Sequence, residues 1–381
     1  MLIGVDAREL EGKPHGVGRV VSNILRQWAI DARGHRFILY FKNQIPGLDF
    51  LRQPHFETKL TRAPSPIDRG RIWEQVILPR QLKKDRVDVL LSPCYTIPLF
   101  ANCPAVVMIY DISFQTRPET YPLLNGMLWR WLARWSVRLA RKVIVSSDFT
   151  ADEILSNYGR RHKHKISRVY LGIEEKFKPD HNEESKKRLA SKLGIAAPFF
   201  LFVGTLFERR NVPLIVRAFR KLTLKHPDCL LVVVGSNPRE FGGETAQLKN
   251  LLRKCQIEDK VMRFDYLPED DLQALLRTAV CLVYPSTYEG FGLPMVEAMA
   301  SGTPVVISSA PTLTEVSDGA ACVADPLTED ALCSAMTAML EDPRVRGEFV
   351  RKGLERARKL DWGQTASSVL SAIEEVSAVN P

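Results

Sequence analysis

The stretch from Tyr284 to Ile307 constrains the fold of this chain more than any other segment. An apolar run leads into a loop punctuated by Pro285, Gly290 and Gly292. A helix is predicted to begin at Pro294, because proline is favoured at a first helical position, where its missing N–H would be unpaired anyway. The helix ends near Gly302, and the next apolar run predicts a buried strand. This strand–loop–helix–strand unit brings free backbone N–H groups and the positive end of a helix dipole to one loop, where a phosphate can bind.

Two carboxylates lie on this unit. Glu289 falls in the loop and Glu297 about one turn into the helix, with seven residues between them. A carboxylate accepts two hydrogen bonds in one plane, as a pair of sugar hydroxyls requires. The pair therefore suits a ligand with hydroxyls at both ends and phosphate between them. The alternative is a solvated helix-start glutamate and an ordinary acidic loop residue.

The whole string from Glu289 to Val306 resembles the sequence signature of the family 4 retaining glycosyltransferases. The opening of the chain and the Gly204-Thr205-Leu206 element look most like the mannosyltransferase branch of that family. The resemblance implies an α/β GT-B fold, with two doubly wound Rossmann-like domains facing across a cleft. In that family the first glutamate contacts hydroxyls of the donor sugar and the second binds the ribose of the nucleotide, which assigns these roles to Glu289 and Glu297. Gly290, Phe291, Gly292 and Leu293 form the remainder of the donor-binding loop.

A second match follows an earlier apolar run. Gly204-Thr205 leads to Arg209, Arg210 and Asn211. Two adjacent guanidinium groups before a helix form a competent diphosphate clamp and would stabilise charge on a departing nucleoside diphosphate. An isolated Arg-Arg pair is more often a solvated loop, but this one resembles the Gly-Thr…Arg-Lys-Asn element of the family. The resemblance implies that Arg209 and Arg210 bind the diphosphate, with Arg210 where lysine is usual.

The first half carries weaker motifs. The opening Ile-Gly-Val-Asp-Ala-Arg and the later Gly16-Val17-Gly18-Arg19 resemble the N-terminal loop of the family, where glycines let the backbone approach donor and acceptor. Tyr110-Asp111 follows a predicted strand, at the edge where parallel sheets bind ligands. Relatives usually carry His-Asp there, so Tyr110 is a departure, and Asp111 is a candidate catalytic residue. Tyr266 and Leu267 match positions that pack around the base.

Length and charge constrain the number of domains and the class of partner. The 381 residues are enough for two domains, and the charged, Pro-flanked run near Lys178 to Lys192 predicts a linker between them, over 179–195. The resemblance implies an acceptor-binding domain over 1–178, a donor-binding domain over 196–360 and a C-terminal helix over 361–381 that packs back on the first domain. Residues 1–178 hold 29 basic and 17 acidic side chains, against 24 and 27 in the remainder. A basic first half indicates an anionic partner, and no zinc-finger or RNP-type motif supports nucleic acid.

The segment from Leu123 to Arg141 predicts an amphipathic helix. At about 100° per residue its apolar side chains share one face beside an arginine stripe; they are Leu124, Met127, Leu128, Trp131, Leu132, Trp135 and Leu139. Two interpretations stay open. The helix faces the core with a solvated basic edge, or it lies at a lipid interface.

The resemblance implies a hexosyltransferase that moves a sugar to a hydroxyl of a glycan or lipid-linked acceptor in polysaccharide or lipopolysaccharide biosynthesis. The first candidate for the sugar is mannose, with GDP-mannose as the donor. No cofactor or metal is expected, because the two arginines replace a metal on the diphosphate. The absence of a signal peptide and seven scattered cysteines favour a cytoplasmic protein, with peripheral association to an anionic membrane on the inner face of the plasma membrane. The alternatives are a non-catalytic nucleotide-sugar-binding or scaffolding protein and a nucleotide-sugar epimerase on the same fold.

Overall fold

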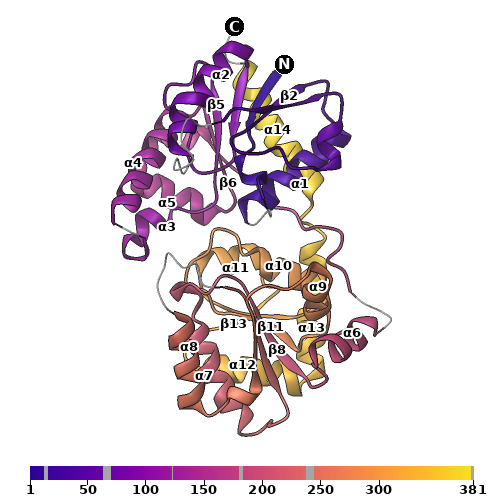
Figure 1. Ribbon diagram of the computed structural model, residues 1–381. Coiled ribbons are helices and arrows are strands. Elements are labelled where there is room, and N and C mark those ends of the chain that lie inside the picture. The colour runs from indigo at the N-terminus through magenta and orange to yellow at the C-terminus, as the bar shows by residue number, and fades with distance from the viewer. Residues whose placement is uncertain (13–15, 63–69, 122, 180–182, 237–243, 379–381) are drawn as a thin grey trace. The chain divides into compact units, whose positions relative to one another are not determined.

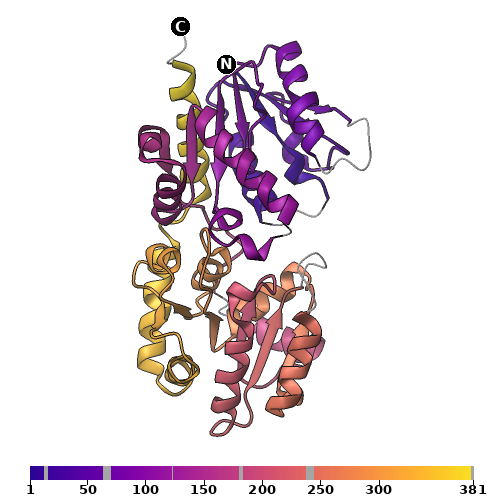
Figure 2. The same cartoon turned by 90° about the vertical axis from the view of Figure 1, so that its left-hand side faces the viewer.

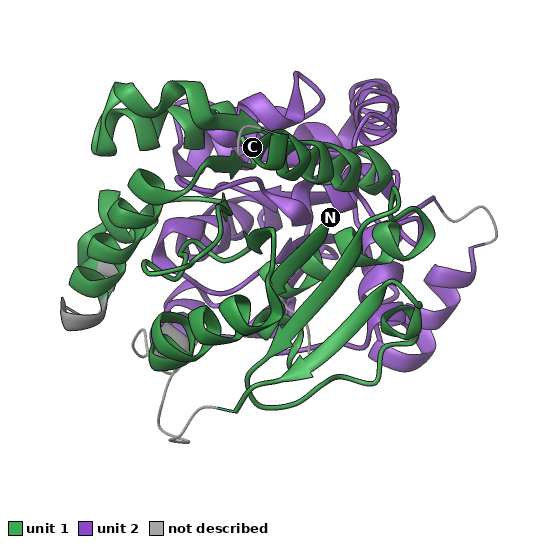
Figure 3. Cartoon of the chain, turned by 90° about the horizontal axis from the view of Figure 1, so that it is seen from above, with its two compact units in different colours: residues 1–172, 361–381 green, residues 173–360 purple. Residues whose placement is uncertain are grey.

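The computed structural model describes residues 1–12, 16–62, 70–121, 123–179, 183–236 and 244–378. The chain divides into two compact units, Met1–Gly172 with Asp361–Pro381, and Ile173–Leu360 (Figure 3). Each unit is a parallel sheet with helices packed on it (Figures 1 and 2). Both sheets have the doubly wound order that the sequence predicts.

Unit 1 has a seven-stranded sheet in the order β3-β2-β1-β4-β5-β6-β7. Its strands are β1 (Leu2–Asp6), β2 (Arg36–Phe41), β3 (Phe56–Leu60), β4 (Val89–Ser92), β5 (Ala105–Ile109), β6 (Lys142–Val145) and β7 (Ile166–Arg168). Its α-helices are α1 (Val17–Ile30), α2 (Leu78–Asp85), α3 (Ser113–Thr116), α4 (Leu123–Leu139), α5 (Asp148–Tyr158) and α14 (Trp362–Ala378).

Unit 2 has a six-stranded sheet in the order β10-β9-β8-β11-β12-β13. Its strands are β8 (Phe199–Val203), β9 (Leu230–Val234), β10 (Val261–Phe264), β11 (Cys281–Tyr284), β12 (Val305–Ser308) and β13 (Cys322–Ala324). Its α-helices are α6 (Glu184–Leu193), α7 (Val212–Thr223), α8 (Glu244–Cys255), α9 (Glu269–Thr278), α10 (Leu293–Ala300), α11 (Pro311–Ser317), α12 (Glu329–Glu341) and α13 (Pro343–Ala357).

The central strands are buried along their whole length. β8 reads Phe-Phe-Leu-Phe-Val and β9 Leu-Leu-Val-Val-Val, and they pair in register from Phe199 with Leu230 to Val203 with Val234. Continuous apolar runs of this kind are expected where helices cover both faces of a parallel sheet. Some helices begin at a side-chain cap; before α5 the Ser147 hydroxyl accepts from the Thr150 N–H at 3.1 Å.

The C-terminal helix belongs to unit 1. α14 packs against α1, and the Trp28 indole N–H donates to the Ala366 carbonyl at 3.0 Å. His35 lies 2.8 Å from Glu374 and adds a polar contact to the same interface. In Figure 2 this yellow helix runs alongside the indigo and purple elements of unit 1.

The boundary between the units differs from the expected linker. It falls between Gly172 and Ile173, and segment 179–195, of which 180–182 lie outside the described residues, carries α6 within unit 2. Leu189 is fully buried on that helix, and Arg188 pairs with buried Asp271 at 2.6 Å. The high charge that suggested a linker instead ties α6 to α9.

Candidate functional site

The candidate donor site lies at the switch point of the unit 2 sheet. The chain leaves the central strand β8 toward β9 on one side and returns to β11 on the other. The connections after these two strands therefore diverge and leave a crevice at their carboxyl ends, where open α/β sheets bind ligands. The loop after β8 carries Gly204 to Arg210, and the loop after β11 carries Pro285 to Gly292. The sequence motifs thus come from adjacent loops.

Hydrogen bonds hold the two loops to each other and to the next strand. The Thr287 N–H donates to the Arg209 carbonyl at 2.8 Å, and the Asn211 amide donates to the Pro285 carbonyl at 2.9 Å. The Ser308 hydroxyl donates to the Ser286 carbonyl from the next strand. Arg209 and Arg210 belong to a single 3-10 turn, η6 (Glu208–Arg210), so both are held by a rigid frame.

Glu289 is the centre of a buried polar cluster. Its Oε1 accepts from the Tyr284 hydroxyl at 2.9 Å and from the Ser286 hydroxyl at 2.8 Å. The Nε of Arg210 lies 3.1 Å from the same oxygen and forms an ion pair whose N–H is not aligned as a hydrogen bond. Since all these contacts fall on Oε1, they fix the carboxylate in one orientation.

The guanidinium of Arg210 is buried against its neighbours. It lies over the Tyr284 ring at 5.4 Å. Burial lowers the pKa of Arg210, but Glu289 and Tyr284 together outweigh that effect and the net shift is upward. Burial raises the pKa of Tyr284. Arg210 is therefore a permanent cation in a low-dielectric crevice, the environment in which charge stabilisation is strongest.

Gly204 makes room for Arg210. A Cβ at this position would lie 1.6 Å from Nη1 of Arg210, and the φ of +148° is one that side-chain-bearing residues rarely adopt. The neighbouring Arg209 has its guanidinium over the Phe207 ring at 4.5 Å, and its buried Nε has no hydrogen-bond partner among the described residues. An anion bound here would supply one.

The loop after β11 leads into α10 through Gly292, whose φ is +91°. With no side chain to cap the helix, its first N–H groups are available to an anion. Leu293 is half-buried, whereas Phe291 and Glu297 are 4% and 3% exposed. Gly290 and Thr205 lie in the same two loops, and the Thr205 carbonyl accepts from the Phe207 N–H at 2.8 Å.

Tyr266 and Leu267 lie farther along the sheet edge, after β10. Two strands separate β10 from β11 in the sheet, and β9 and β8 occupy those positions. Tyr266 is 60% exposed and Leu267 8%. The exposed ring, rather than the buried leucine, is the one that a bound base can stack on.

The predicted residues of unit 1 lie at the same kind of edge in the other sheet. Gly16, with φ +46°, precedes Val17 and Gly18 at the start of α1. Asp111 Oδ1 accepts from the backbone and the hydroxyl of Ser113, at 2.8 and 2.6 Å, and fixes the start of α3. Tyr110 is 9% exposed, burial raises its pKa, and its hydroxyl contacts the Met108 sulfur at 3.9 Å. The tyrosine thus packs into the core of unit 1.

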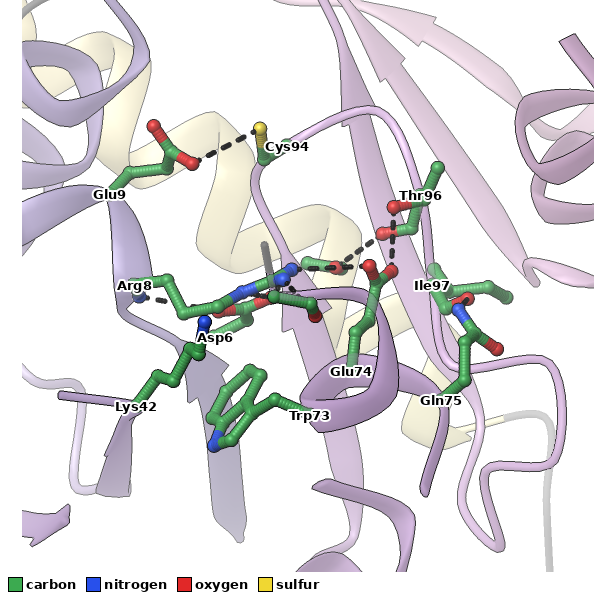
Figure 4. A network of polar contacts seen from close by, with 12 residues as sticks. Asp6, Arg8, Glu9, Lys42, Trp73, Glu74, Gln75, Cys94, Thr96 and Ile97 are labelled. Atoms are coloured by element: carbon green, nitrogen blue, oxygen red, sulfur yellow. Dashed lines mark hydrogen bonds and ion pairs between the residues drawn. The ribbon is translucent and has the colours of Figure 1, made fainter. Parts of the chain in front are cut away.

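A second polar network, which the motifs did not predict, lies at the switch point of unit 1 between β1 and β4 (Figure 4). Arg8 Nε contacts both oxygens of Asp6 at 2.9 and 3.0 Å, and Nη2 lies 3.3 Å from Glu74 Oε2. The guanidinium also lies 4.9 Å from the centre of the Trp73 ring. The guanidinium of Arg8 is therefore already paired. It stabilises the loops around the crevice and is not a free cation for a ligand.

Glu9 has a different environment in this network. The Cys94 thiol, 3.6 Å from its Oε1, is its one side-chain hydrogen-bond donor among the described residues (Figure 4). Burial raises the pKa of Glu9, and the charge of Asp6 adds to the shift. A half-buried carboxylate with only a weak donor has capacity to bind a hydroxyl. In the sequence, the position of Glu9 shortly after the apolar run of β1 was the available indication that it lies at the ligand-binding edge of the sheet.

Comparison with known proteins agrees with this geometry. Residues 183–356 match the family described as Glycosyl transferases group 1, and residues 14–177 match Glycosyltransferase Family 4. An O-antigen chain mannosyltransferase of Escherichia coli is 30% identical over 70% of this chain and 69% of its own length. An O-antigen chain mannosyltransferase of Salmonella typhimurium is 28% identical over 67% of this chain, and the match spans 65% of the length of that protein.

Solved structures agree on the fold. A sucrose-phosphate synthase from Thermosynechococcus elongatus superposes with a TM-score of 0.81 at 19% identity, over 100% of both chains. Two Rossmann-like units, each a doubly wound parallel sheet, give the chain the GT-B fold. More narrowly, the chain belongs to glycosyltransferase family 4.

Proposed function

We propose that this chain transfers a hexosyl group from a nucleoside diphosphate sugar to a hydroxyl of a glycan or lipid-linked acceptor, with retention of the anomeric configuration. The first candidate donor is GDP-mannose, which the O-antigen mannosyltransferase relatives support. The observation that carries the proposal is the cluster of Arg209, Arg210 and Glu289 on two joined loops at the switch point of unit 2.

Each residue of this cluster has a defined part in the proposal. Arg209 and Arg210 bind the diphosphate and stabilise the negative charge that grows as it leaves. The first N–H groups of α10 add to that stabilisation. Glu289, held through Oε1, presents Oε2 to hydroxyls of the donor sugar, and Glu297 binds the ribose. The two guanidinium groups supply the positive charge, so the donor site needs no metal in this proposal.

The acceptor belongs to unit 1 in this proposal. Asp111 and Glu9 are the carboxylates at the carboxyl ends of β5 and β1, and Gly16 to Gly18 give a backbone that a ligand can approach. The departing diphosphate takes the proton of the acceptor hydroxyl, so no side chain is assigned as general base. We also infer a cytoplasmic setting, which the free state of the seven cysteines supports. In the part of the chain that is described, no helix has the length and hydropathy to cross a bilayer.

The test is transfer from radiolabelled GDP-mannose and UDP-glucose to a lipid-linked acceptor, with product configuration read by NMR. Glu289→Gln should reduce turnover by about 100-fold or more, as expected when a positioned polar group is removed. Arg358→Gln, an exposed change at the C-cap of α13, is the matched control and should leave turnover intact. Wild-type protein that binds nucleotide sugar and never turns it over would favour the binding or scaffolding alternative, which the packed Tyr110 motivates.

A further inference from the structure

The outer face of α4 in unit 1 carries an exposed apolar stripe. Its four side chains are spaced by four residues, so they line one side of the helix; Met127 is 54% exposed, Trp131 51%, Trp135 37% and Leu139 47%. The opposite side, with Leu132, Ala133 and Val137, is buried in the core of unit 1. The core-facing interpretation of the helix is therefore correct for Leu132 but wrong for Trp131 and Trp135.

Basic side chains accompany this stripe. Arg134 and Arg138 are exposed on the same side of α4, which forms the outer flank of unit 1 in Figure 1. The guanidinium of Arg138 lies 5.5 Å from the centre of the Trp135 ring, and the Trp131 and Trp135 rings are 6.3 Å apart. Exposed tryptophan interleaved with arginine is the composition of helices that lie in a membrane interface.

A basic pocket opens where the stripe ends. Its volume is about 540 Å³, and it is lined by the end of α4, the start of β6, the 3-10 turn η5 (Arg160–Lys165) and α14. Leu139 belongs to both the stripe and the pocket. Arg138, Arg141, Lys142 and Lys165 contribute cations, whereas Glu375 is the one carboxylate in the lining and already pairs with Lys142 at 2.5 Å.

Among the described residues that line this pocket, four cations face one carboxylate, so positive charge remains in excess. Lys165 donates to the carbonyls of Arg138 and Ala140, both at 2.9 Å. Burial, together with the positive charges of Arg141, Arg138 and Arg161, lowers its pKa to about 8. Burial lowers the pKa of His162 as well, with Lys165 as the next cause. Cations that repel one another in this way are stabilised by a bound anion.

We propose that the α4 face, defined as the exposed stripe together with the basic pocket, docks on the surface of an anionic membrane. The stripe enters the boundary between headgroups and acyl chains, and the pocket receives a lipid phosphate. Charge complementarity selects this occupant, because the stripe alone would suit any apolar partner whereas the cations require an anionic one.

The position of the pocket separates it from the candidate acceptor residues. Lys142 and Lys165 lie at the amino ends of β6 and β7, whereas Tyr110 and Asp111 follow the carboxyl end of β5. Because these strands are parallel, the two groups lie at opposite edges of the sheet. Docking therefore leaves the acceptor edge of unit 1 unoccupied. This inference depends on the proposed function in one respect, namely that the acceptor is lipid-linked.

The experiment is cosedimentation of the full chain with vesicles of phosphatidylcholine alone and with a third of the lipid as phosphatidylglycerol. Binding should occur to the anionic vesicles and weaken as salt is raised. Arg134→Gln with Arg138→Gln should weaken it about 30-fold, at about fivefold for each cation lost near the surface. The control Arg358→Gln with Lys359→Gln removes the same charge from exposed positions of unit 2 and should bind as wild type.

The stripe and the pocket are tested separately. Trp131→Ala with Trp135→Ala should weaken binding while leaving thermal unfolding unchanged, because both side chains are exposed. Arg141→Gln should weaken vesicle binding while it leaves every side chain of the stripe unchanged. Equal binding to neutral vesicles, or equal binding by the arginine double variant and its control, would overturn the proposal. Nucleotide affinity, measured by calorimetry on the same samples, distinguishes this failure from failure of the proposed transferase activity.

Discussion

Glu289→Gln should selectively destabilise unit 2. The substitution keeps the shape of the side chain and removes its charge, so Arg210 is left buried beside a neutral amide. Two unit charges about 4 Å apart attract by about 4 kcal/mol at an effective dielectric constant of about 20. Breaking a buried ion pair by removing one partner costs about 3–5 kcal/mol. The glutamine oxygen still accepts from Tyr284 and Ser286, so the expected loss is about 3 kcal/mol.

The distribution of tryptophan allows the two units to be followed separately. All six tryptophans, at positions 28, 73, 129, 131, 135 and 362, lie in unit 1. Tryptophan fluorescence during urea unfolding therefore reports on unit 1 and should not change in the variant. Hydrogen exchange of the β8 and β11 amides reports on unit 2, and a loss of about 3 kcal/mol corresponds to exchange about 100-fold faster.

A double-mutant cycle isolates the ion pair. Arg210→Met removes the cation, and the double variant with Glu289→Gln should be less destabilised than the sum of the single changes by about 2 kcal/mol. Additive effects, or exchange in unit 2 that changes by less than about 1 kcal/mol in Glu289→Gln, would show that the ion pair does not organise the site.

Three further predictions test other parts of the account. Gly204→Ala should weaken nucleoside diphosphate binding by about tenfold or more in calorimetry, because the new Cβ displaces Arg210; Gly347→Ala, where a Cβ meets nothing within 4 Å, should bind as wild type. Glu9→Gln should raise the acceptor KM while leaving nucleotide affinity unchanged, and the opposite pattern would remove Glu9 from the acceptor site. The lowered pKa of Lys165, about 8 against 10.5 for a free lysine, penalises the charged form in the folded state. Stability of unit 1 by tryptophan fluorescence should therefore rise as the pH increases from 8 to 10.5, and Lys165→Met should remove that rise.

The fold and the donor loops were predictable because their signals are local. Alternating apolar runs and helical segments specify a doubly wound sheet, and short motifs directly after β8 and β11 come together because those strands are neighbours at the switch point. Two partners of Glu289 were also within reach, since Tyr284 and Ser286 lie in the stretch from Tyr284 to Ile307.

Other features depend on contacts that no local pattern encodes. Arg8 and Glu74 are far apart in sequence, so their ion pair follows from the packing of η3 (Trp73–Ile77) near β1. For α4, apolar periodicity alone could not decide which stripe faces the core. The small Ala133 and Ser136 pack there with Val137, and this turns Trp131 outward. Likewise, the charged run that resembled a linker contains the buried Leu189, which anchors α6.

The most direct test of the central claim is a calorimetric titration of the full chain with GDP, UDP and ADP and their sugar conjugates, without metal and then with magnesium. The account predicts selective binding of one nucleotide that magnesium does not change, that Arg209→Ala weakens and that Arg358→Ala leaves intact. Absence of binding by every nucleotide, or equal binding by Arg209→Ala, would contradict a diphosphate site at the β8–β11 switch point.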